Sequence, residues 1–157
     1  MPENAFSRTG VDEPLLLLAI TSNEESLSHF REIAASSKWK LTSVCGCAEA
    51  RQIFEKECFP VIVTDTALSD GHWRDVLETC AKLPESPLLI VTSLHADELL
   101  WAEVLNLGGY DVLMQPFDRA EVTRVIELAY AQWTRRSTRR TVSKESQAGT
   151  AGMSASG

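Results

Sequence analysis

Short apolar runs alternate along the chain with amphipathic stretches. Runs rich in Leu, Val and Ile lie at residues 14–20, 41–45, 61–64, 88–92 and 111–114. Their length and content predict buried β-strands, and the stretches that follow them, with apolar residues three and four positions apart, predict five amphipathic helices. Residues 1–12 are polar and show neither pattern, so they are expected to be flexible.

Two of the predicted helices carry additional signals. In the last one, Asp118 and Glu121 form an N-terminal capping box ahead of apolar positions that continue to Trp133. The helix at about 97–107 has apolar residues over a wide arc, and Leu100 and Trp101 fall beyond its core stripe. The pattern predicts either an interaction surface on this helix or a helix that is buried more deeply than average.

Five strand–helix units with nearly continuous apolar strands predict an α/β fold with a parallel sheet covered on both faces. Right-handed crossovers favour the doubly wound five-stranded sheet with strand order 2-1-3-4-5. We expect this domain to span residues 13–134. After it, at 135–157, a basic stretch rich in Ser, Gly and Ala lacks apolar periodicity and is expected to be a disordered tail.

Asp65 is the most informative single residue, because it places a carboxylate at the tip of a buried strand. A buried charge is costly without partners, so such a group is normally paired, bound to a metal or used as a nucleophile. The alternative is an aspartate that caps a helix or fixes a turn. In the predicted fold, Asp65 faces the crevice at the carboxyl ends of the strands, where ligands bind.

Charge is distributed unevenly over the 157 residues, whose net charge is −7. From Thr134 onward there are five basic residues and one acidic residue, whereas the preceding part has ten basic and twenty-one acidic residues. An acidic body argues against binding to nucleic acid. The run at 14–20 is too short to span a membrane and lacks a basic flank. We therefore expect a cytoplasmic protein whose four cysteines are reduced thiols in or near the core.

Three segments on these predicted strands resemble the receiver domain of two-component response regulators. Residues 65–71 (Asp-Thr-Ala-Leu-Ser-Asp-Gly) are similar to the family's Asp-x-x-Leu-Pro-Asp-Gly loop, and Thr92 lies at its Thr/Ser position. Residues 108–117 are similar to its Gly-Ala-x-Asp-Tyr-Leu-x-Lys-Pro-Phe stretch, with Gln115 at the lysine position. The resemblance covers about residues 14–133 and rests on the ordered set of motifs.

The resemblance implies that a histidine kinase or a phosphotransfer protein donates a phosphoryl group to Asp65. Thr92 would bind the phosphoryl group, and the chain would not be an enzyme beyond this self-catalysed transfer. In the family, two acids after the first strand help to hold Mg²⁺; here they fall on Thr21-Ser22 or Ser22-Asn23. The expected metal ligands are therefore Asp65, the Ala67 carbonyl, Asn23 and Glu24, a set that predicts weak Mg²⁺ binding.

Other departures from the family pattern affect the same reaction. Gln115 can donate a hydrogen bond but carries no charge. Ala67 and Leu94, each two residues after a motif position, cannot orient a water, so loss of a phosphoryl group from Asp65 is expected to be slow. Val112 stands at the position of the usual aromatic switch residue.

Three functional hypotheses follow. The first is a receiver domain acting as a signalling switch, with a downstream protein or a second copy bound to the face formed by the fourth helix, fifth strand and fifth helix. The second is a pseudo-receiver that docks partners without phosphorylation. The third is a small flavodoxin-like ligand-binding domain, for which the loop at 21–23 offers hydroxyl and amide groups. His72 and Trp73, next to the Asp65 loop, are expected to be a partly exposed pair at a helix start.

Overall fold

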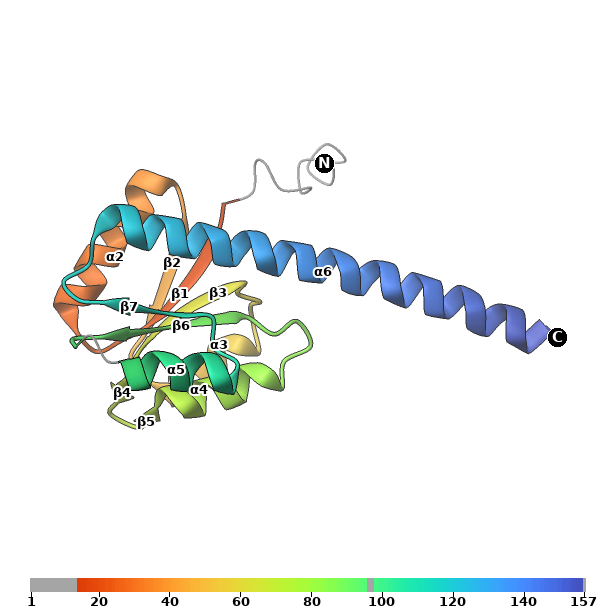
Figure 1. Cartoon of the computed structure of the whole chain (residues 1–157), viewed down its shortest axis with the longest axis horizontal. Helices are drawn as coiled ribbons and strands as arrows, with labels where there is room; N and C mark the ends of the chain where they lie inside the picture. The colour runs from red at the N-terminus through yellow and green to blue at the C-terminus, as the bar shows by residue number, and fades with distance from the viewer. Residues whose placement is uncertain (1–13, 96–97, 157) are drawn as a thin grey trace.

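The computed structural model describes residues 14–95 and 98–156, and their side chains up to residue 138. Seven strands and five helices alternate along this part of the chain (Figure 1). The strands are β1 (Leu16–Ile20), β2 (Lys40–Val44), β3 (Val61–Asp65), β4 (Ala67–Leu68), β5 (Gly71–His72), β6 (Leu88–Ser93) and β7 (Asp111–Met114). The helices are α2 (Glu24–Ser37), α3 (Cys47–Phe54), α4 (Trp73–Ala81), α5 (Glu98–Leu107) and α6 (Arg119–Ser156).

The five longer strands form one parallel sheet in the order β2-β1-β3-β6-β7. This is the predicted doubly wound order, so the predicted fold class is confirmed. The remaining pair, β4 and β5, forms a two-residue antiparallel hairpin directly after Asp65. Sequence analysis does not find it, because strands of two residues are too short to show a hydrophobic period.

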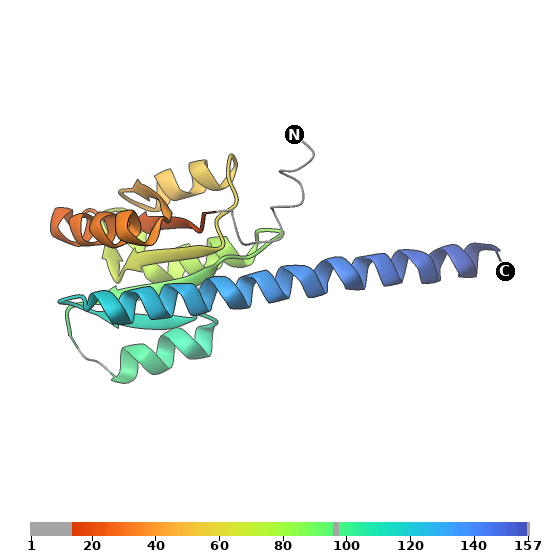
Figure 2. The same ribbon diagram turned by 90° about the horizontal axis from the view of Figure 1, so that it is seen from above.

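Helices cover both faces of the sheet (Figures 1 and 2). Helices α2 and α6 pack on one face, and α3, α4 and α5 on the other. Successive residues of a strand point to opposite faces, so Leu17 and Ala19 of β1 belong to the first core, whereas Leu18 and Ile20 belong to the second. The continuous apolar strands predicted from the sequence are thus explained by a sheet buried on both sides.

Trp73 corrects one expectation, because its side chain is fully buried rather than partly exposed. It begins α4 and packs with Val76 and Cys80 in the core beneath that helix. His72, just before it, is half-buried and caps the helix. The sequence shows these two residues only as neighbours at a helix start, whereas the β4–β5 hairpin turns the indole inward.

Helix α6 continues to Ser156, whereas the sequence pattern predicts an irregular tail from residue 135. Its first half is fixed by burial of Val122, Val125, Ile126 and Ala129. The Ser137 hydroxyl also donates a hydrogen bond of 3.2 Å to Glu85 of the body. Once a helix is nucleated, adding further turns costs little. At 1.5 Å per residue its 38 residues span about 57 Å, and its C-terminal part extends away from the sheet (Figures 1 and 2).

The four cysteines are free thiols, of which Cys47 and Cys80 are buried and Cys45 and Cys58 are exposed. Burial raises the pKa of Cys80 to about 12, which keeps its sulfur protonated at neutral pH. The expected location in or near the core holds for Cys47 and Cys80, whereas Cys45 and Cys58 lie at the surface. Among the described residues, no helix is both long enough and apolar enough to cross a membrane.

Candidate functional site

Asp65 lies at the carboxyl end of β3, between the ends of two neighbouring strands. The β3–β6 register places Thr92 directly opposite Asp65. On the other side, Ile20 of β1 pairs with Thr64, so the next residue, Thr21, adjoins Asp65. The parallel sheet thus brings together three polar side chains that are far apart in the sequence.

Both carboxylate oxygens of Asp65 contact hydroxyl groups. The Thr21 hydroxyl donates a hydrogen bond of 2.7 Å to Oδ2. The Thr92 hydroxyl lies 3.3 Å from Oδ1 and 3.4 Å from the Thr64 carbonyl oxygen, and its single proton serves these two acceptors. Thr66 ties the two strand ends together, because its hydroxyl donates to the Thr92 carbonyl oxygen at 2.8 Å. Hydrogen bonds from neutral groups therefore hold the carboxylate in place.

An open cleft surrounds Asp65. Its lining residues are Asn23, Asp65, Thr66, Ala67, Thr92, Ser93, Leu94, His95 and Gln115. Among the described residues that line the cleft, Asp65 is the one carboxylate, and none is a Lys or Arg. The Asp65 carboxylate is therefore surrounded by hydroxyl, amide, imidazole and apolar groups of the described lining residues.

The structure brings most of the predicted site residues together. Thr92, Gln115, Ala67 and Asn23 all line the cleft with Asp65. The backbone N–H of Gln115 donates to the Ser93 carbonyl oxygen at 2.8 Å, which fixes the end of β7 against β6. Glu24 is the exception: it is exposed in the first turn of α2 and does not line the cleft.

The lining residues fit a Mg²⁺ ion poorly. Mg²⁺ demands octahedral coordination by oxygen, which proteins supply through carboxylates and retained waters. Asp65 supplies one carboxylate, and Ala67 can add a carbonyl oxygen. The side-chain oxygen of Asn23 accepts a hydrogen bond of 3.1 Å from the Ser26 N–H and caps α2. In the described residues, no group of three His, Cys, Asp or Glu side chains could hold a metal ion.

Thr21 is the residue in contact with Asp65 that the sequence does not single out. It lies just after β1 and is 5% exposed, and its hydroxyl oxygen accepts a hydrogen bond of 3.0 Å from the Asn23 N–H. The signal available in the sequence is a hydroxyl residue where the receiver pattern places an acid. The sequence allows the acidic pair to be aligned with Thr21-Ser22 or with Ser22-Asn23, so it does not indicate which of these side chains turns toward Asp65.

The loop after Asp65 is also attached to α3. The Asp70 carboxylate accepts hydrogen bonds from the Cys47 N–H at 2.8 Å and the Ala48 N–H at 3.0 Å. These bonds to the helix N-terminus hold the pKa of Asp70 below its ordinary value. Gly46 allows this close approach, because a Cβ there would lie 2.5 Å from an Asp70 carboxylate oxygen. A side chain 23 positions away thus caps a helix that has no side-chain cap of its own.

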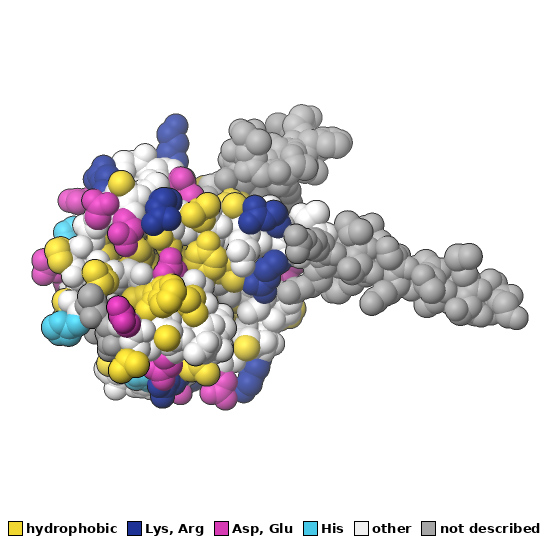
Figure 3. Space-filling view, in the orientation of Figure 1, with side chains coloured by type: hydrophobic (Ala, Val, Ile, Leu, Met, Phe, Trp, Pro, Cys, Tyr) yellow, Lys and Arg dark blue, Asp and Glu magenta, His cyan; other side chains and the backbone are white. Residues whose placement is uncertain are grey.

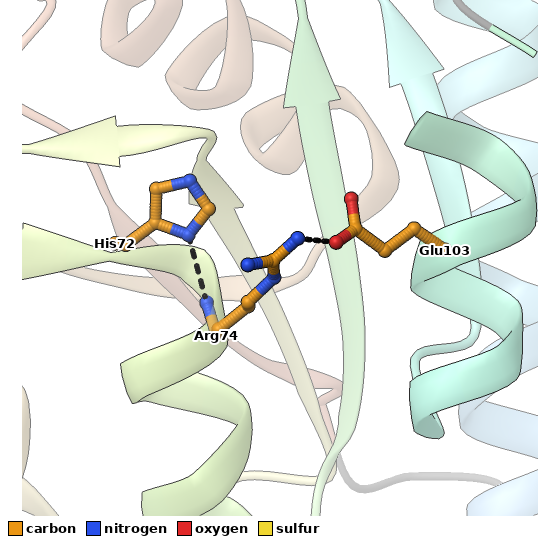
Figure 4. Close-up of polar contacts among 3 residues, drawn as sticks. All are labelled: His72, Arg74 and Glu103. Carbon is orange, nitrogen blue, oxygen red and sulfur yellow. Dashed lines mark hydrogen bonds and ion pairs between the residues drawn. The ribbon is translucent and has the colours of Figure 1, made fainter. Parts of the chain in front are cut away.

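A second set of contacts runs from the same loop toward α5 (Figure 4). The His72 Nδ1 atom accepts a hydrogen bond of 3.4 Å from the Arg74 backbone N–H. The His72 N–H donates to the Asp75 carboxylate at 2.9 Å and completes a capping box at the start of α4. The Arg74 guanidinium forms an ion pair with Glu103 of α5. The β4–β5 hairpin is therefore linked to α5 through the first turn of α4.

Helix α5 and the adjoining strand β7 expose several large apolar side chains. Leu99 is 81% exposed, Trp101 51%, Leu107 53% and Met114 46%. Figure 3 shows hydrophobic side chains gathered over this helix and the neighbouring edge of the sheet. Leu100 packs half-buried against the core beneath α5, so it does not belong to the exposed surface predicted for it. The wide apolar arc of this helix thus divides into a core side and a solvent side.

No protein-family model matches the sequence, and no curated protein matches it. Solved structures match well. The signal receiver domain of an HD domain-containing protein from Pseudomonas fluorescens has a TM-score of 0.74 at 18% identity, over 82% of this chain and 96% of that domain. The receiver domain of a sensor histidine kinase from Pseudomonas aeruginosa has a TM-score of 0.68 at 18% identity, over 76% of this chain and 99% of that domain. That structure has a magnesium ion coordinated in its active site cleft.

A dimeric structure is also among the matches. The beryllofluoride-activated NtrC4 receiver domain dimer has a TM-score of 0.68 at 21% identity, covering 75% of this chain and 98% of that domain. At these identities the similarity establishes a shared fold. The matched regions cover nearly the whole of each compared domain.

Proposed function

We propose that this chain, which has the fold of response regulator receiver domains, is a receiver module of two-component signal transduction that works mainly through protein–protein contacts. Its upstream partner would be a histidine kinase or a phosphotransfer protein. Its downstream partner, or a second copy of the chain, would bind the face formed by α5, β7 and α6.

One observation carries this proposal. Asp65 ends the central strand of a receiver-type sheet, and the Thr92 hydroxyl lies 3.3 Å from its carboxylate on the adjacent strand. Gln115, at the end of the next strand, lines the same cleft. These are the positions that the receiver pattern assigns to the phosphoacceptor, the hydroxyl and the lysine.

The chemistry of phosphorylation would need more charge than the cleft offers. An Asp65 oxygen would attack phosphorus while the bond from phosphorus to the leaving atom breaks, which is a ring nitrogen of the donor histidine or the acyl oxygen of acetyl phosphate. Negative charge would spread over the equatorial phosphoryl oxygens. Thr92 and Gln115 can donate hydrogen bonds to those oxygens, but neither carries a positive charge. A bound Mg²⁺ would neutralise part of the charge. Because one aimed contact is worth about 3 kcal/mol in such a transition state, we expect phosphorylation of Asp65 to be slow and docking to dominate.

Two observations on α5 support the proposed docking role. The solvent side of α5 presents Leu99, Trp101 and Leu107, and exposed apolar patches of this kind mark protein interaction sites. The Arg74–Glu103 ion pair joins α5 to the helix that follows the Asp65 loop. A partner that moves the Asp65 loop would thereby bias the position of α5, and a partner that binds α5 would bias the position of the loop.

Mass spectrometry of the intact protein tests this proposal. Wild-type protein and the Asp65→Asn variant are incubated with Mg²⁺ and acetyl phosphate, and a parallel sample receives beryllofluoride and is followed by NMR. We expect little phosphoryl adduct on wild-type protein and weak, incomplete spectral change with beryllofluoride. Rapid stoichiometric adduct formation that disappears in Asp65→Asn would instead establish a conventional phosphorylation switch.

A further inference from the structure

We infer that Thr21 makes the Asp65 cleft independent of a divalent cation, because its hydroxyl binds directly to the carboxylate that a metal would otherwise contact. This inference rests on the proposed receiver function, in which Asp65 stands at the phosphoacceptor position. It assigns to Thr21 the role of a positioning residue that determines which kind of group the cleft accepts.

The orientation of the Thr21 hydroxyl is fixed on both sides. Its proton is donated to Asp65 Oδ2 at 2.7 Å, and its oxygen accepts from the Asn23 N–H at 3.0 Å. The side chain is 5% exposed, so water has little access to it. A buried hydroxyl with both a donor and an acceptor partner has one preferred rotamer, and here that rotamer points at Asp65.

The Asp65 carboxylate therefore has hydrogen-bond partners without a cation. Thr21 contacts Oδ2, and the Thr92 hydroxyl lies 3.3 Å from Oδ1. A partly buried carboxylate is tolerated when its oxygens are hydrogen-bonded. In this cleft, two threonine hydroxyls meet that requirement.

The remaining lining groups do not complete a cation site. Among the described lining residues, Ser93 offers a hydroxyl, His95 an imidazole and Gln115 an amide, none of them a carboxylate, and the Asn23 amide oxygen accepts a hydrogen bond from the Ser26 N–H. The missing feature is a second carboxylate on the loop after β1. Thr21 is buried next to Asp65 and Ser22 is exposed beside it, so carboxylates at these two positions would supply oxygen ligands at the mouth of the cleft.

Cation binding by the full chain tests the inference. Binding of Mn²⁺ is measured by electron paramagnetic resonance, and Mg²⁺ by its effect on the melting temperature. The proteins are wild type, Thr21→Asp/Ser22→Asp and a control, Ser28→Asp/Gln52→Glu, that adds the same charge at exposed positions. We expect the first variant to bind Mn²⁺ at least about tenfold more tightly than wild type or control. Adding Asp65→Asn to that variant should abolish the gain.

Two results would overturn the inference: wild-type protein that binds the cation as tightly as Thr21→Asp/Ser22→Asp, or a folded double variant with no gain. If the double variant does not fold, NMR on single variants decides. Thr21→Val should shift the amide resonances of Asn23 and Asp65 away from their wild-type positions. Thr21→Ser, which keeps the hydroxyl, should leave these resonances close to the wild-type positions. Equal shifts in both variants would contradict the proposed hydrogen bond. These readouts detect a cation and a hydrogen bond, so they can fail while the phosphorylation and docking results stand.

Discussion

At the scale of single residues, the loop after Asp65 depends on charges and hydroxyls placed by the fold. Thr21 and Thr92 hold Asp65, and Asp70 holds the start of α3. Each contact joins residues at least 22 positions apart. The sequence therefore shows the residue types but not the pairings.

Asp70→Asn should destabilise the protein at neutral pH, because the Cys47 and Ala48 N–H groups bond to different carboxylate oxygens, whereas the amide has one acceptor oxygen and no charge to interact with the helix dipole. Folding lowers the pKa of Asp70 from 3.8. A depressed carboxyl pKa contributes stability above the unfolded value, and this contribution is lost as pH falls through the folded pKa. In urea titrations at several pH values, the difference between wild type and Asp70→Asn should be full at pH 7 and shrink below pH 3.8.

The exposed substitution Glu57→Gln serves as the control for that series. It removes one surface carboxylate and should change the free energy of unfolding at pH 7 by less than about 0.5 kcal/mol. A constant difference between wild type and Asp70→Asn down to the lowest pH would mean that the capping carboxylate does not act through its charge.

Gln115→Lys tests the missing charge at the end of β7. A lysine at this position would aim an ammonium group into the cleft that contains Asp65. Because an aimed contact of about 3 kcal/mol corresponds to roughly a hundredfold in rate, we expect the rate of adduct formation with acetyl phosphate to rise at least tenfold, or about 1.4 kcal/mol. Intact-mass time courses measure it, and Gln115→Met, which is similar in length but uncharged, should not raise the rate.

At the scale of elements, helix α5 combines a buried side and an exposed side. Val104 is fully buried against the sheet, whereas Trp101 is 51% exposed. Stability and docking should therefore respond to different residues of one helix.

Val104→Ala should lower the free energy of unfolding by about 2 kcal/mol, because it removes buried methyl groups and leaves a cavity. Trp101→Gln should change stability less than Val104→Ala, since the indole is half in solvent and the amide keeps a donor near Asp111, which accepts a hydrogen bond of 3.4 Å from Trp101 Nε1. It should weaken binding of a partner or of a second copy. Urea denaturation and analytical ultracentrifugation separate the two effects. Equal destabilisation by both variants would show that the indole belongs to the core.

The strands and their order could be predicted because each apolar run is long, continuous and flanked by polar turns. The β4–β5 hairpin, the inward turn of Trp73 and the half-burial of Leu100 could not be predicted, because each depends on tertiary packing over a few residues. The same limit applied to the site. The position at a strand end predicts Asp65, and the resemblance to receiver motifs predicts Thr92 and Gln115. The role of Thr21 depends on the β1–β3 register, which places it beside Asp65.

At the scale of the whole molecule, α6 belongs to the body over its first half and leaves the body over its second. The last fully buried residue of α6 is Ala129, and Tyr130 and Trp133 pack partly buried against the same core. Further along the helix, Ser137 forms a hydrogen bond with Glu85. The part of α6 after residue 138 extends past the sheet (Figures 1 and 2).

Truncation after residue 138 should therefore change the free energy of unfolding by less than about 1 kcal/mol, the range typical of surface changes. Truncation after residue 124 should prevent folding, because it removes the buried residues Val125, Ile126 and Ala129. Circular dichroism with urea titration measures both. A large loss of stability in the longer fragment would show that the distal half of α6 supports the body.

The capping of α3 by Asp70 has a consequence for observing the protein in solution. Hydrogen exchange and chemical shift of a backbone amide depend on the group that accepts its hydrogen bond. The Cys47 and Ala48 amides are bonded to the loop that begins at Asp65, although they belong to a different helix. These two amides therefore act as built-in reporters: any rearrangement of the Asp65 loop would be recorded as faster exchange at the first turn of α3.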